Sequence, residues 1–235
     1  MVPLTDYEKY IRTEELLGLQ KAPVGLACHD EMQFQIVHQV AELWMKLIGH
    51  ELDHVVVELA ADQTHEAVHT LRRVQGIQRL LLAQMDLLDT MAPKDYMTIR
   101  TVLGRGSGQE SPGFRHLLRV PGEKLWPALA ALLSRRGVTV REVYEHHSEH
   151  AGLYHLCEGF LDFDQLLQGW RQRHLMLVYR IIGAGTPSLK GKPSELLEQG
   201  MKHRFFPALW EVRDEVFEEW SRTMLHTGKD TGYHG

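Results

Sequence analysis

Two histidines of this chain lie on apolar faces of predicted helices, where an imidazole needs a partner. His38 follows Phe34 by one helical turn, and His174 follows Trp170 by one turn. Burial of an imidazole must be offset by a hydrogen bond, a metal or a ligand. Two such histidines on separate helices could face each other across a planar cofactor, one ligating iron and the other on the substrate side. The alternative is two unrelated, hydrogen-bonded core histidines.

Arg100 is the candidate anion-binding residue. It stands among apolar neighbours in the segment DYMTIRTVLG, just before a Gly- and Ser-rich stretch at 104–113 whose composition is typical of a functional loop or lid. A guanidinium is a forked, permanently charged donor that suits a substrate carboxylate bound through two hydrogen bonds. On spacing alone, a surface arginine in a solvated face is an equally good interpretation.

Two strings resemble zinc-protease motifs. Residues 50–54 fit H-E-x-x-H, and residues 146–150 fit the inverted form H-x-x-E-H. The chain has 15 histidines, so such matches arise by chance, and Asp53 puts a charge between the first pair of would-be ligands. A catalytic zinc also needs a third protein ligand, and the sequence nominates none. The zinc hydrolase is therefore the weakest hypothesis.

Apolar residues at helical spacing occur along most of the chain, without a convincing strand or internal repeat. The predicted helices cover 5–19, 29–51 with an extension to about 59, 64–91, 128–135, 140–154, 160–182 and 194–224. Pro121 and Pro127 are expected to bracket a break, and Pro207 to kink or break the last helix. The helix at 29–51 carries two apolar stripes, which predicts burial on both faces. The two stripes are Ile36, Val40, Leu43 and Leu47, and Phe34, Ala41, Met45 and Ile48.

Composition excludes several functional classes. A chain of 235 residues with a formal charge of −5 can form one large domain, and it has no basic footprint for nucleic acid or membrane surfaces. No apolar run approaches membrane-spanning length, and the polar N-terminus is unlike a secretory signal, so a cytoplasmic protein is expected. Its two cysteines do not form a disulfide framework. The substrate is expected to be a small molecule.

Four blocks in a fixed order make the chain resemble the tryptophan 2,3-dioxygenase superfamily of histidine-ligated haem oxygenases. The blocks are HDEMQFQIVHQVAELWMKLIGHEL, DYMTIRTVLGRGSG, WRQRHLMLVYRIIG and FFPALWEVR. The resemblance implies an all-α subunit, a helical bundle of the tryptophan 2,3-dioxygenase type, over 1–235. It further implies haem b as cofactor, O2 as co-substrate, an indole substrate with a carboxylate, and a homotetramer.

The resemblance also implies a role for each matching residue. His174 corresponds to the proximal haem ligand, and His38 to the distal histidine that hydrogen-bonds the indole N–H. Arg100 corresponds to the arginine that grips the substrate carboxylate. The other implied substrate-binding residues are Phe34, Tyr96 and Leu103, the distal-side Ser107, Thr186 near the substrate ammonium, and Tyr7 and Tyr10, which belong to an N-terminal segment at 1–25 that reaches a neighbouring subunit in the family.

Two departures from the family pattern leave the reaction open. After Thr186 the chain has Pro187, Leu189 and Lys190 where the family has glycines and serines that close over the substrate, and the region between 113 and 154 looks short by one helical insertion. Insertion of two oxygen atoms would cleave the indole C2–C3 bond to an N-formylkynurenine-type product, whereas insertion of one would give a 2-oxindole. A non-catalytic haem-binding protein is the other hypothesis. Tryptophan, a methylated tryptophan and other indoles all fit the sequence, for catabolic or biosynthetic use.

Overall fold

The structure is a computed structural model that describes residues 3–104, 106, 108–183 and 203–227. Within these residues every regular element is helical, which confirms the predicted all-α fold. The helices are α1 (Asp6–Ile11), α2 (Thr13–Leu17), η1 (Pro23–Gly25), α3 (Glu31–Ala60), α4 (Thr64–Ala83), α5 (Met85–Leu88), α6 (Pro93–Val102), η2 (Gly108–Glu110), α7 (Pro112–Val120), η3 (Pro121–Leu125), α8 (Trp126–Arg136), α9 (Val140–Glu145), α10 (Ala151–Ile182) and α12 (Pro207–Thr227). None of the helices in the described part of the chain is long and apolar enough to span a membrane.

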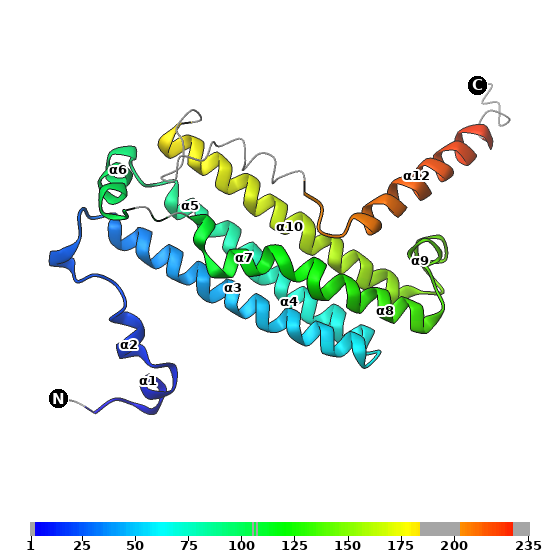
Figure 1. The fold of residues 1–235 in the computed structure, drawn as a ribbon, viewed down its shortest axis with the longest axis horizontal. Helices are drawn as coiled ribbons and strands as arrows, with labels where there is room; N and C mark the ends of the chain where they lie inside the picture. The colour runs from blue at the N-terminus through cyan, green and yellow to red at the C-terminus, as the bar shows by residue number, and fades with distance from the viewer. Residues whose placement is uncertain (1–2, 105, 107, 184–202, 228–235) are drawn as a thin grey trace, which may run out of the picture.

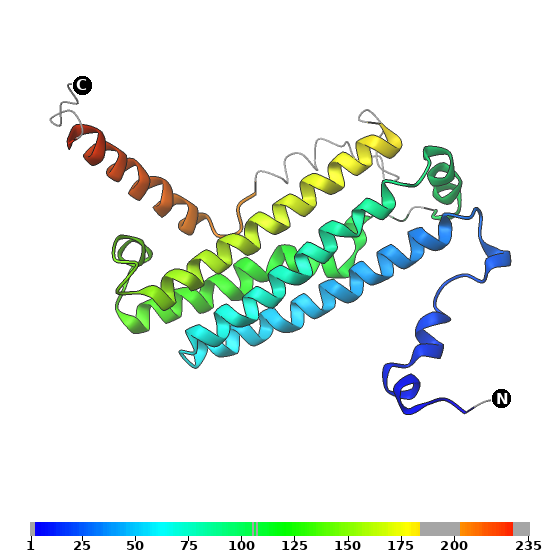
Figure 2. The same cartoon turned by 180° about the vertical axis from the view of Figure 1, so that it is seen from behind.

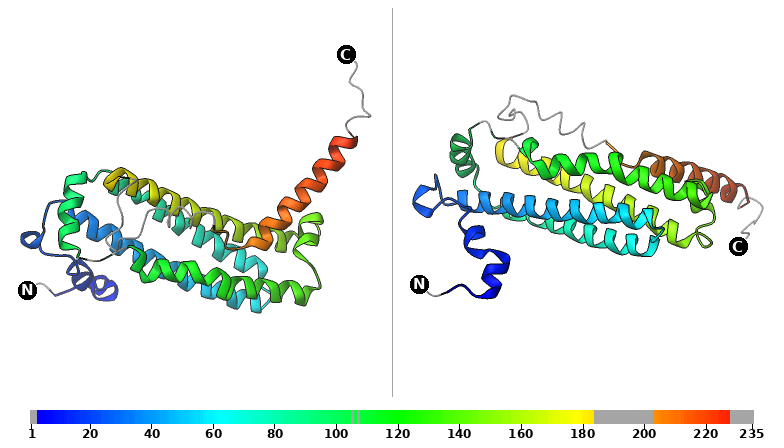
Figure 3. Two further views of the ribbon diagram at one scale, coloured as in Figure 1. Left: turned by 45° about the horizontal axis from the view of Figure 1, so that its top comes forward. Right: turned by 60° about the horizontal axis from the view of Figure 1, so that its bottom comes forward.

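Four long helical segments lie side by side and form the bundle (Figures 1 and 2). The segments are α3, α4, α10 and the continuous run from α7 through η3 to α8. Helix α4 packs closely against both α3 and α10, and α3 also packs against α7 and α8. Since α3 and α10 run in opposite directions, the first half of α3 and the last half of α10 share one end of the bundle, where α6 also lies (Figure 3).

The apolar core occupies mainly the opposite end. From α3 it takes Met45 and the residues after it, such as Leu52, and from α10 it takes mainly the first half, including Phe160 and Phe163. Burying such side chains supplies most of the stability of the bundle, at about 1.5–3 kcal/mol each. His38 precedes the core residues of α3, and His174 follows most of those of α10. The core therefore leaves one end of the bundle for a site.

The sequence predicts burial of both apolar stripes of the central helix, and this prediction is wrong for one of the two stripes within a single chain. Met45 and Ile48 are buried, but Ile36 and Leu43 of the other stripe are 42% and 49% exposed. Helices α4, α7 and α8 cover the side of α3 that carries Met45 and Ile48. Periodicity reports only that a stripe is apolar, and the packing of the other helices decides whether the stripe is covered within the same chain.

Several predicted boundaries differ from the observed ones. The helix expected at 5–19 breaks at Arg12, which has the left-handed φ of 56°, and the helix expected at 64–91 ends at Ala83 before the short α5. The segment expected at 140–154 is interrupted at 146–150 between α9 and α10, and DYMTIRTVLG falls mostly in α6. Helix α3 reaches Ala60, close to the expected end.

The break expected between Pro121 and Pro127 is also wrong. Helix α7 continues into a π-helical turn at Pro121–Leu125 and then into α8. Pro121 lacks the N–H that would continue the α-helical hydrogen bonds of α7, and the run passes through the π-helical turn at this point, whereas Pro127 lies in the first turn of α8. The predicted helix at 194–224 is described only from Pro207, where α12 begins, and the expected helix before Pro207 lies outside the described residues.

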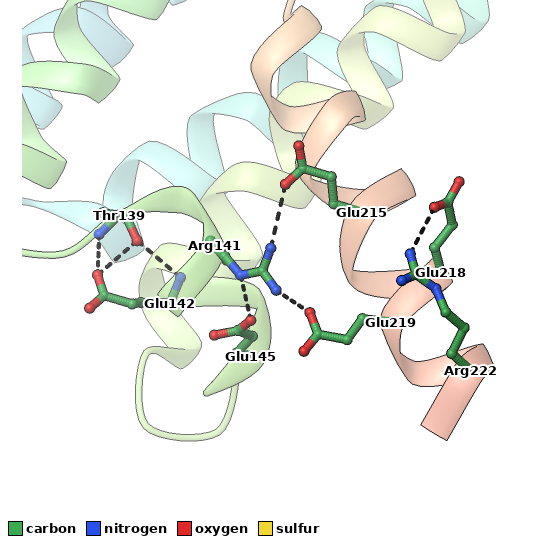
Figure 4. A network of polar contacts seen from close by, with 8 residues as sticks. All are labelled: Thr139, Arg141, Glu142, Glu145, Glu215, Glu218, Glu219 and Arg222. Carbon is green, nitrogen blue, oxygen red and sulfur yellow. Dashed lines mark hydrogen bonds and ion pairs between the residues drawn. The ribbon is translucent and has the colours of Figure 1, made fainter. Parts of the chain in front are cut away.

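Helix α12 projects from the bundle and is tied to it at its base. Asp164, a buried residue of α10, accepts hydrogen bonds from the backbone N–H of Phe205 and from Nε1 of Trp210, both at 2.9 Å. Further along, Arg141 of α9 pairs with Glu145 and with two glutamates of α12, Glu215 and Glu219 (Figure 4). Exposed ion pairs of this kind contribute little stability, so the Asp164 contacts are the stronger anchor.

Candidate functional site

The first wall of the candidate site is formed by His38 and Phe34 on α3. Their ring centroids lie 4.1 Å apart, and Nδ1 of His38 lies 2.7 Å from the carbonyl oxygen of Phe34. A carbonyl oxygen only accepts hydrogen bonds, so Nδ1 carries the proton in the neutral ring. Nε2 is then left with a lone pair, and it can accept a hydrogen bond from the N–H group of a ligand.

The His38 ring is both accessible and strongly influenced by the surrounding protein. It borders a groove of about 710 Å³ along α3 and α7, and its accessible area is that of an exposed residue. Burial among protein groups nevertheless lowers the pKa of His38, and the Phe34 carbonyl and the Glu42 carboxylate only partly oppose this effect. A groove that admits water but is walled by protein accounts for both observations. His38 is therefore neutral at pH 7 and can accept a hydrogen bond from a ligand.

Helix α6 brings Tyr96 and Arg100 to the same end of the bundle. The Tyr96 ring lies 6.3 Å from that of Phe34. Burial raises the pKa of Tyr96, and the charge of Arg100 opposes the rise, which indicates that Arg100 lies close to this ring. Leu103 caps the C-terminal end of the same helix and is partly exposed. An aromatic wall with an adjacent guanidinium can hold an aromatic ligand that carries a carboxylate.

The second wall is formed by His174 and Trp170 on α10. Their rings are stacked, with centroids 5.5 Å apart and planes inclined by 15°. Burial is the main cause and the nearby His38 the smaller one that together lower the pKa of His174 to about 4. The electrostatic influence of His38 on His174 indicates that the two rings lie near each other at this end of the bundle. His174 is thus a neutral imidazole, the form that ligates a metal.

The surroundings of His174 also fit the haem implied by the sequence resemblance. Nε1 of Trp170 and Nη1 of Arg171 are buried and have no hydrogen-bond partner within the described part of the chain. Buried donors without a partner are rare and need an explanation. Haem carries two propionate carboxylates, and these negatively charged groups can accept hydrogen bonds from both donors. A nitrogen ligand beside two donors that lack a partner among the described residues suits a haem better than a metal ion alone.

The two zinc-like strings have other structural roles. Glu51 is buried and accepts a hydrogen bond from Arg73 at 2.8 Å, while His54 lies 3.3 Å from Glu58. The residues of the inverted string at 146–150 lie between α9 and α10 instead of on one helix. Among the described residues, no three His, Cys, Asp or Glu side chains are grouped to hold a metal ion.

The remaining expected site residues lie apart from these two walls or cannot be placed. Tyr7 and Tyr10 on α1 are 69% and 89% exposed, and α1 packs mainly against α2. Their contribution to a neighbouring subunit's site stays a prediction. Ser107 and Thr186 lie outside the described residues, as does the altered segment after Thr186.

Sequence reasoning missed Glu42, one turn after His38. Its carboxylate accepts hydrogen bonds from the hydroxyl of Ser111 and from the backbone N–H of Gly113, at the start of α7. The Ser-Pro pair at 111–112 is a helix-start signal that could have located α7. Nothing in the sequence connects that start with Glu42, because the two segments are far apart along the chain.

The close approach of α7 to α3 requires glycine at position 113. A Cβ atom there would lie 2.7 Å from Cβ of Met45 and 2.8 Å from Oε2 of Glu42. We expect Gly113→Ala to lower the free energy of unfolding by about 1–3 kcal/mol, because the helices must separate to admit the methyl group. Thermal unfolding measures the effect. Gly122→Ala is the control, since its Cβ would meet nothing within 4 Å, and equal stabilities for the two variants would contradict the prediction.

Taken together, the all-α bundle places two neutral histidines, aromatic rings on both walls and a nearby arginine at one end, an arrangement that could hold a planar cofactor and an aromatic ligand. Comparison with known proteins gives the family of the chain. The family model for tryptophan 2,3-dioxygenase matches residues 4–126. This segment includes His38 and Arg100.

Relatives match most of the chain. The tryptophan 2,3-dioxygenase of Myxococcus xanthus is 32% identical over 263 residues, covering 90% of this chain and 90% of the relative. That of Erythrobacter litoralis is 33% identical over 261 residues, covering 89% of this chain and 98% of the relative. This chain belongs to the tryptophan 2,3-dioxygenase family. The alignment with the first relative is longer than the 235 residues of this chain, so that relative carries residues that this chain lacks.

Proposed function

We propose that this protein is a haem-dependent oxygenase that uses O2 to cleave the indole C2–C3 bond of tryptophan or a close tryptophan derivative. The observation that carries the proposal is the pairing of His38 and His174 at one end of the bundle, with Arg100 and aromatic rings beside them. The names of the relatives, all tryptophan 2,3-dioxygenases, support dioxygenation of tryptophan.

His174 would hold the haem iron. Nε1 of Trp170 and Nη1 of Arg171, which are without a hydrogen-bond partner in the described part of the chain, would be available to the propionates. When bound, the haem supplies the activation of O2. The protein's own task is to hold a neutral imidazole at the iron and to keep it neutral. The burial that lowers the pKa of His174 to about 4 serves this task, because a protonated imidazole has no lone pair for a metal.

The substrate would be held on the side of His38. Nε2 of His38 accepts the indole N–H, since Nδ1 is committed as a donor to Phe34. The rings of Phe34 and Tyr96 form an apolar wall for the indole, and Arg100 binds the carboxylate. An indole N–H is too weak an acid to be removed by imidazole, so His38 orients the ring and does not act as a strong base. Three fixed points define one orientation of the substrate relative to the iron.

The direct test is a spectrum followed by an assay. Purified protein should show a Soret band and, with tryptophan, ascorbate and air, should form a product heavier than tryptophan by two oxygen atoms. A gain of one oxygen atom would instead identify a 2-oxindole-forming monooxygenase. A Soret band without any product would identify a non-catalytic haem protein, and a protein without a Soret band that fails to acquire one with added haem would refute the proposal.

Replacing His38 with alanine should weaken catalysis while leaving haem bound. We expect kcat/KM for tryptophan to fall about 10-fold, which corresponds to the loss of one hydrogen bond. Steady-state assays on haem-loaded protein measure the change. 1-Methyltryptophan, which has no indole N–H, is the control substrate, and wild type and variant should turn it over at similar rates. An equal loss with both substrates would show that His38 does not act through the indole N–H.

The pH dependence of kcat/KM should report the same histidine. Protonated His38 cannot accept the indole N–H, so activity should fall on acidification as His38 takes up a proton. Because burial lowers the pKa of His38, the fall should begin below the ordinary histidine value of about 6.5. A pH profile measures it, and the acid limb should be absent in His38→Ala. An acid limb of equal position in both proteins would assign it to another group.

We also propose a homo-oligomer, with a tetramer as in the family pattern. Apolar side chains are exposed on α2 and α3, including Leu17 at 75% and Leu43 at 49%. Exposed apolar surface of this kind is typical of protein interfaces. Light scattering of the purified protein gives the oligomeric state, and a Leu43→Glu variant should dissociate if the face of α3 is part of the interface.

A further inference from the structure

The first turn of α7 is hydrogen-bonded to α3 at Glu42, one helical turn after His38. Oε2 of Glu42 accepts the backbone N–H of Gly113 at 3.0 Å, and its other oxygen accepts the hydroxyl of Ser111. A carboxylate at the start of a helix is further stabilised by the exposed N–H groups and by the helix dipole. The absence of a side chain at Gly113 lets α7 approach to this distance.

Ser111 makes the attachment directional. Its oxygen accepts the backbone N–H of Phe114 at 3.0 Å and thereby caps α7, so its single hydrogen is left for Glu42. The carboxylate therefore fixes both the capping hydroxyl and one backbone N–H of the same turn. This turn cannot shift along α3 without breaking at least one of these hydrogen bonds.

The same turn of α7 also touches the wall that carries His174. The rings of Phe114 and Trp170 lie 5.1 Å apart, and the Trp170 ring is stacked on His174. The backbone N–H of the same Phe114 donates the hydrogen bond to the Ser111 hydroxyl that caps α7. A continuous series of contacts thus runs from Glu42 on α3, through the first turn of α7, to the imidazole on α10.

We propose that Glu42 is a positioning residue that sets the wall carrying His174 relative to the wall carrying His38, acting through the first turn of α7. Helices α3 and α10 both pack on α4, and α7 provides a second link between them at the end where the site lies. The inference rests on the proposed function only for the assignment of haem and substrate to the two walls. The contacts from Glu42 to Trp170 are present whatever the protein binds. Contact alone does not establish energetic coupling, so the test measures coupling.

The first measurement is amide hydrogen exchange of the full-length protein, as purified. We compare Glu42→Gln with Glu51→Gln, a change of the same type on the same helix that breaks the pair with Arg73 and touches neither wall. In Glu42→Gln, exchange should rise about 10-fold or more in peptides covering 111–120 and also in those covering 168–178, as expected for the loss of a charged hydrogen bond. Glu51→Gln should leave both segments close to wild type.

The second measurement is the rate at which haem is lost to excess apomyoglobin. Glu42→Gln and Phe114→Leu should each raise this rate about 5- to 10-fold, and the double variant should raise it by clearly less than the product of the two, because both changes break the same link. Effects that multiply would overturn the proposal. So would exchange that rises at 111–120 alone while 168–178 stays unchanged.

The two measurements separate this inference from the proposed function. Hydrogen exchange needs neither haem nor turnover, so the link can be tested even if the protein does not oxidise tryptophan. If Glu42→Gln fails to fold, Ser111→Ala gives the same comparison, because it removes one donor and leaves the carboxylate bonded to Gly113. A normal exchange pattern in both variants would likewise refute the positioning role.

Discussion

His174→Ala should yield a folded protein without stably bound haem. The imidazole of His174 is held neutral by burial and is stacked on Trp170, so its removal takes away the only nitrogen ligand that we assign to the iron. The Soret band of the purified variant should be absent or nearly so, while circular dichroism should show the helical content of the wild type. Added imidazole should partly restore the band, since the deleted ring leaves space for a free ligand.

The control for this variant is His155→Ala. His155 lies on the same helix but is exposed, so its removal should leave the Soret band unchanged. If His174→Ala binds haem with a normal spectrum, the ligand assignment is wrong. If both variants lose haem, the loss reflects damage to α10 and not the missing ligand.

Arg100→Lys should reduce kcat/KM for tryptophan by about 10- to 100-fold, mainly through KM. Lysine keeps the charge but loses the forked geometry that binds both oxygens of a carboxylate, and one charged hydrogen bond contributes roughly 1.5–3 kcal/mol. Steady-state kinetics measure the change. Haem content should stay that of the wild type, because Arg100 is assigned to the substrate and not to the cofactor.

Tryptamine separates a role at the carboxylate from a general disturbance of α6. It lacks the carboxylate, so wild type and Arg100→Lys should use it equally poorly. A second control is Arg72→Lys, at an exposed position of α4, which should leave the kinetics with tryptophan unchanged. If Arg100→Lys also lowers the activity with tryptamine, Arg100 has a role other than binding the carboxylate.

The proposed role of Glu42 connects the two walls of the site that these variants alter separately. His174→Ala removes a group from one wall of the site, and Arg100→Lys alters the opposite side. Glu42 and the first turn of α7 would control the relative position of the walls without touching the substrate. A variant of this link should therefore affect haem retention without abolishing it, in contrast with the loss expected for His174→Ala.

Much of the fold could be predicted, because amphipathic helices have a recognisable apolar period in the sequence. The 3.6-residue period located α3, α4 and α10 within a few residues at most ends. The errors fell where local signals are ambiguous. Proline at 121 and 127 was interpreted as a break, yet the helical run passes Pro121 through a π-helical turn and has Pro127 in the first turn of α8, and nothing in the local sequence predicts the left-handed Arg12 that ends α1.

The sequence by itself determined the all-α class, the family and the identity of His38, His174 and Arg100 as candidate site residues. Each of these depends on residue type and on order along the chain. Only the tertiary structure decided that the two histidines influence each other, that the described part of the chain leaves the stripe with Leu43 exposed, and that Glu42 accepts the backbone N–H of Gly113 in the first turn of α7. The physical reason is the same in each case. Periodicity reports which face of a helix is apolar, whereas the partner of that face, or of a carboxylate, is chosen by packing between segments far apart in the chain.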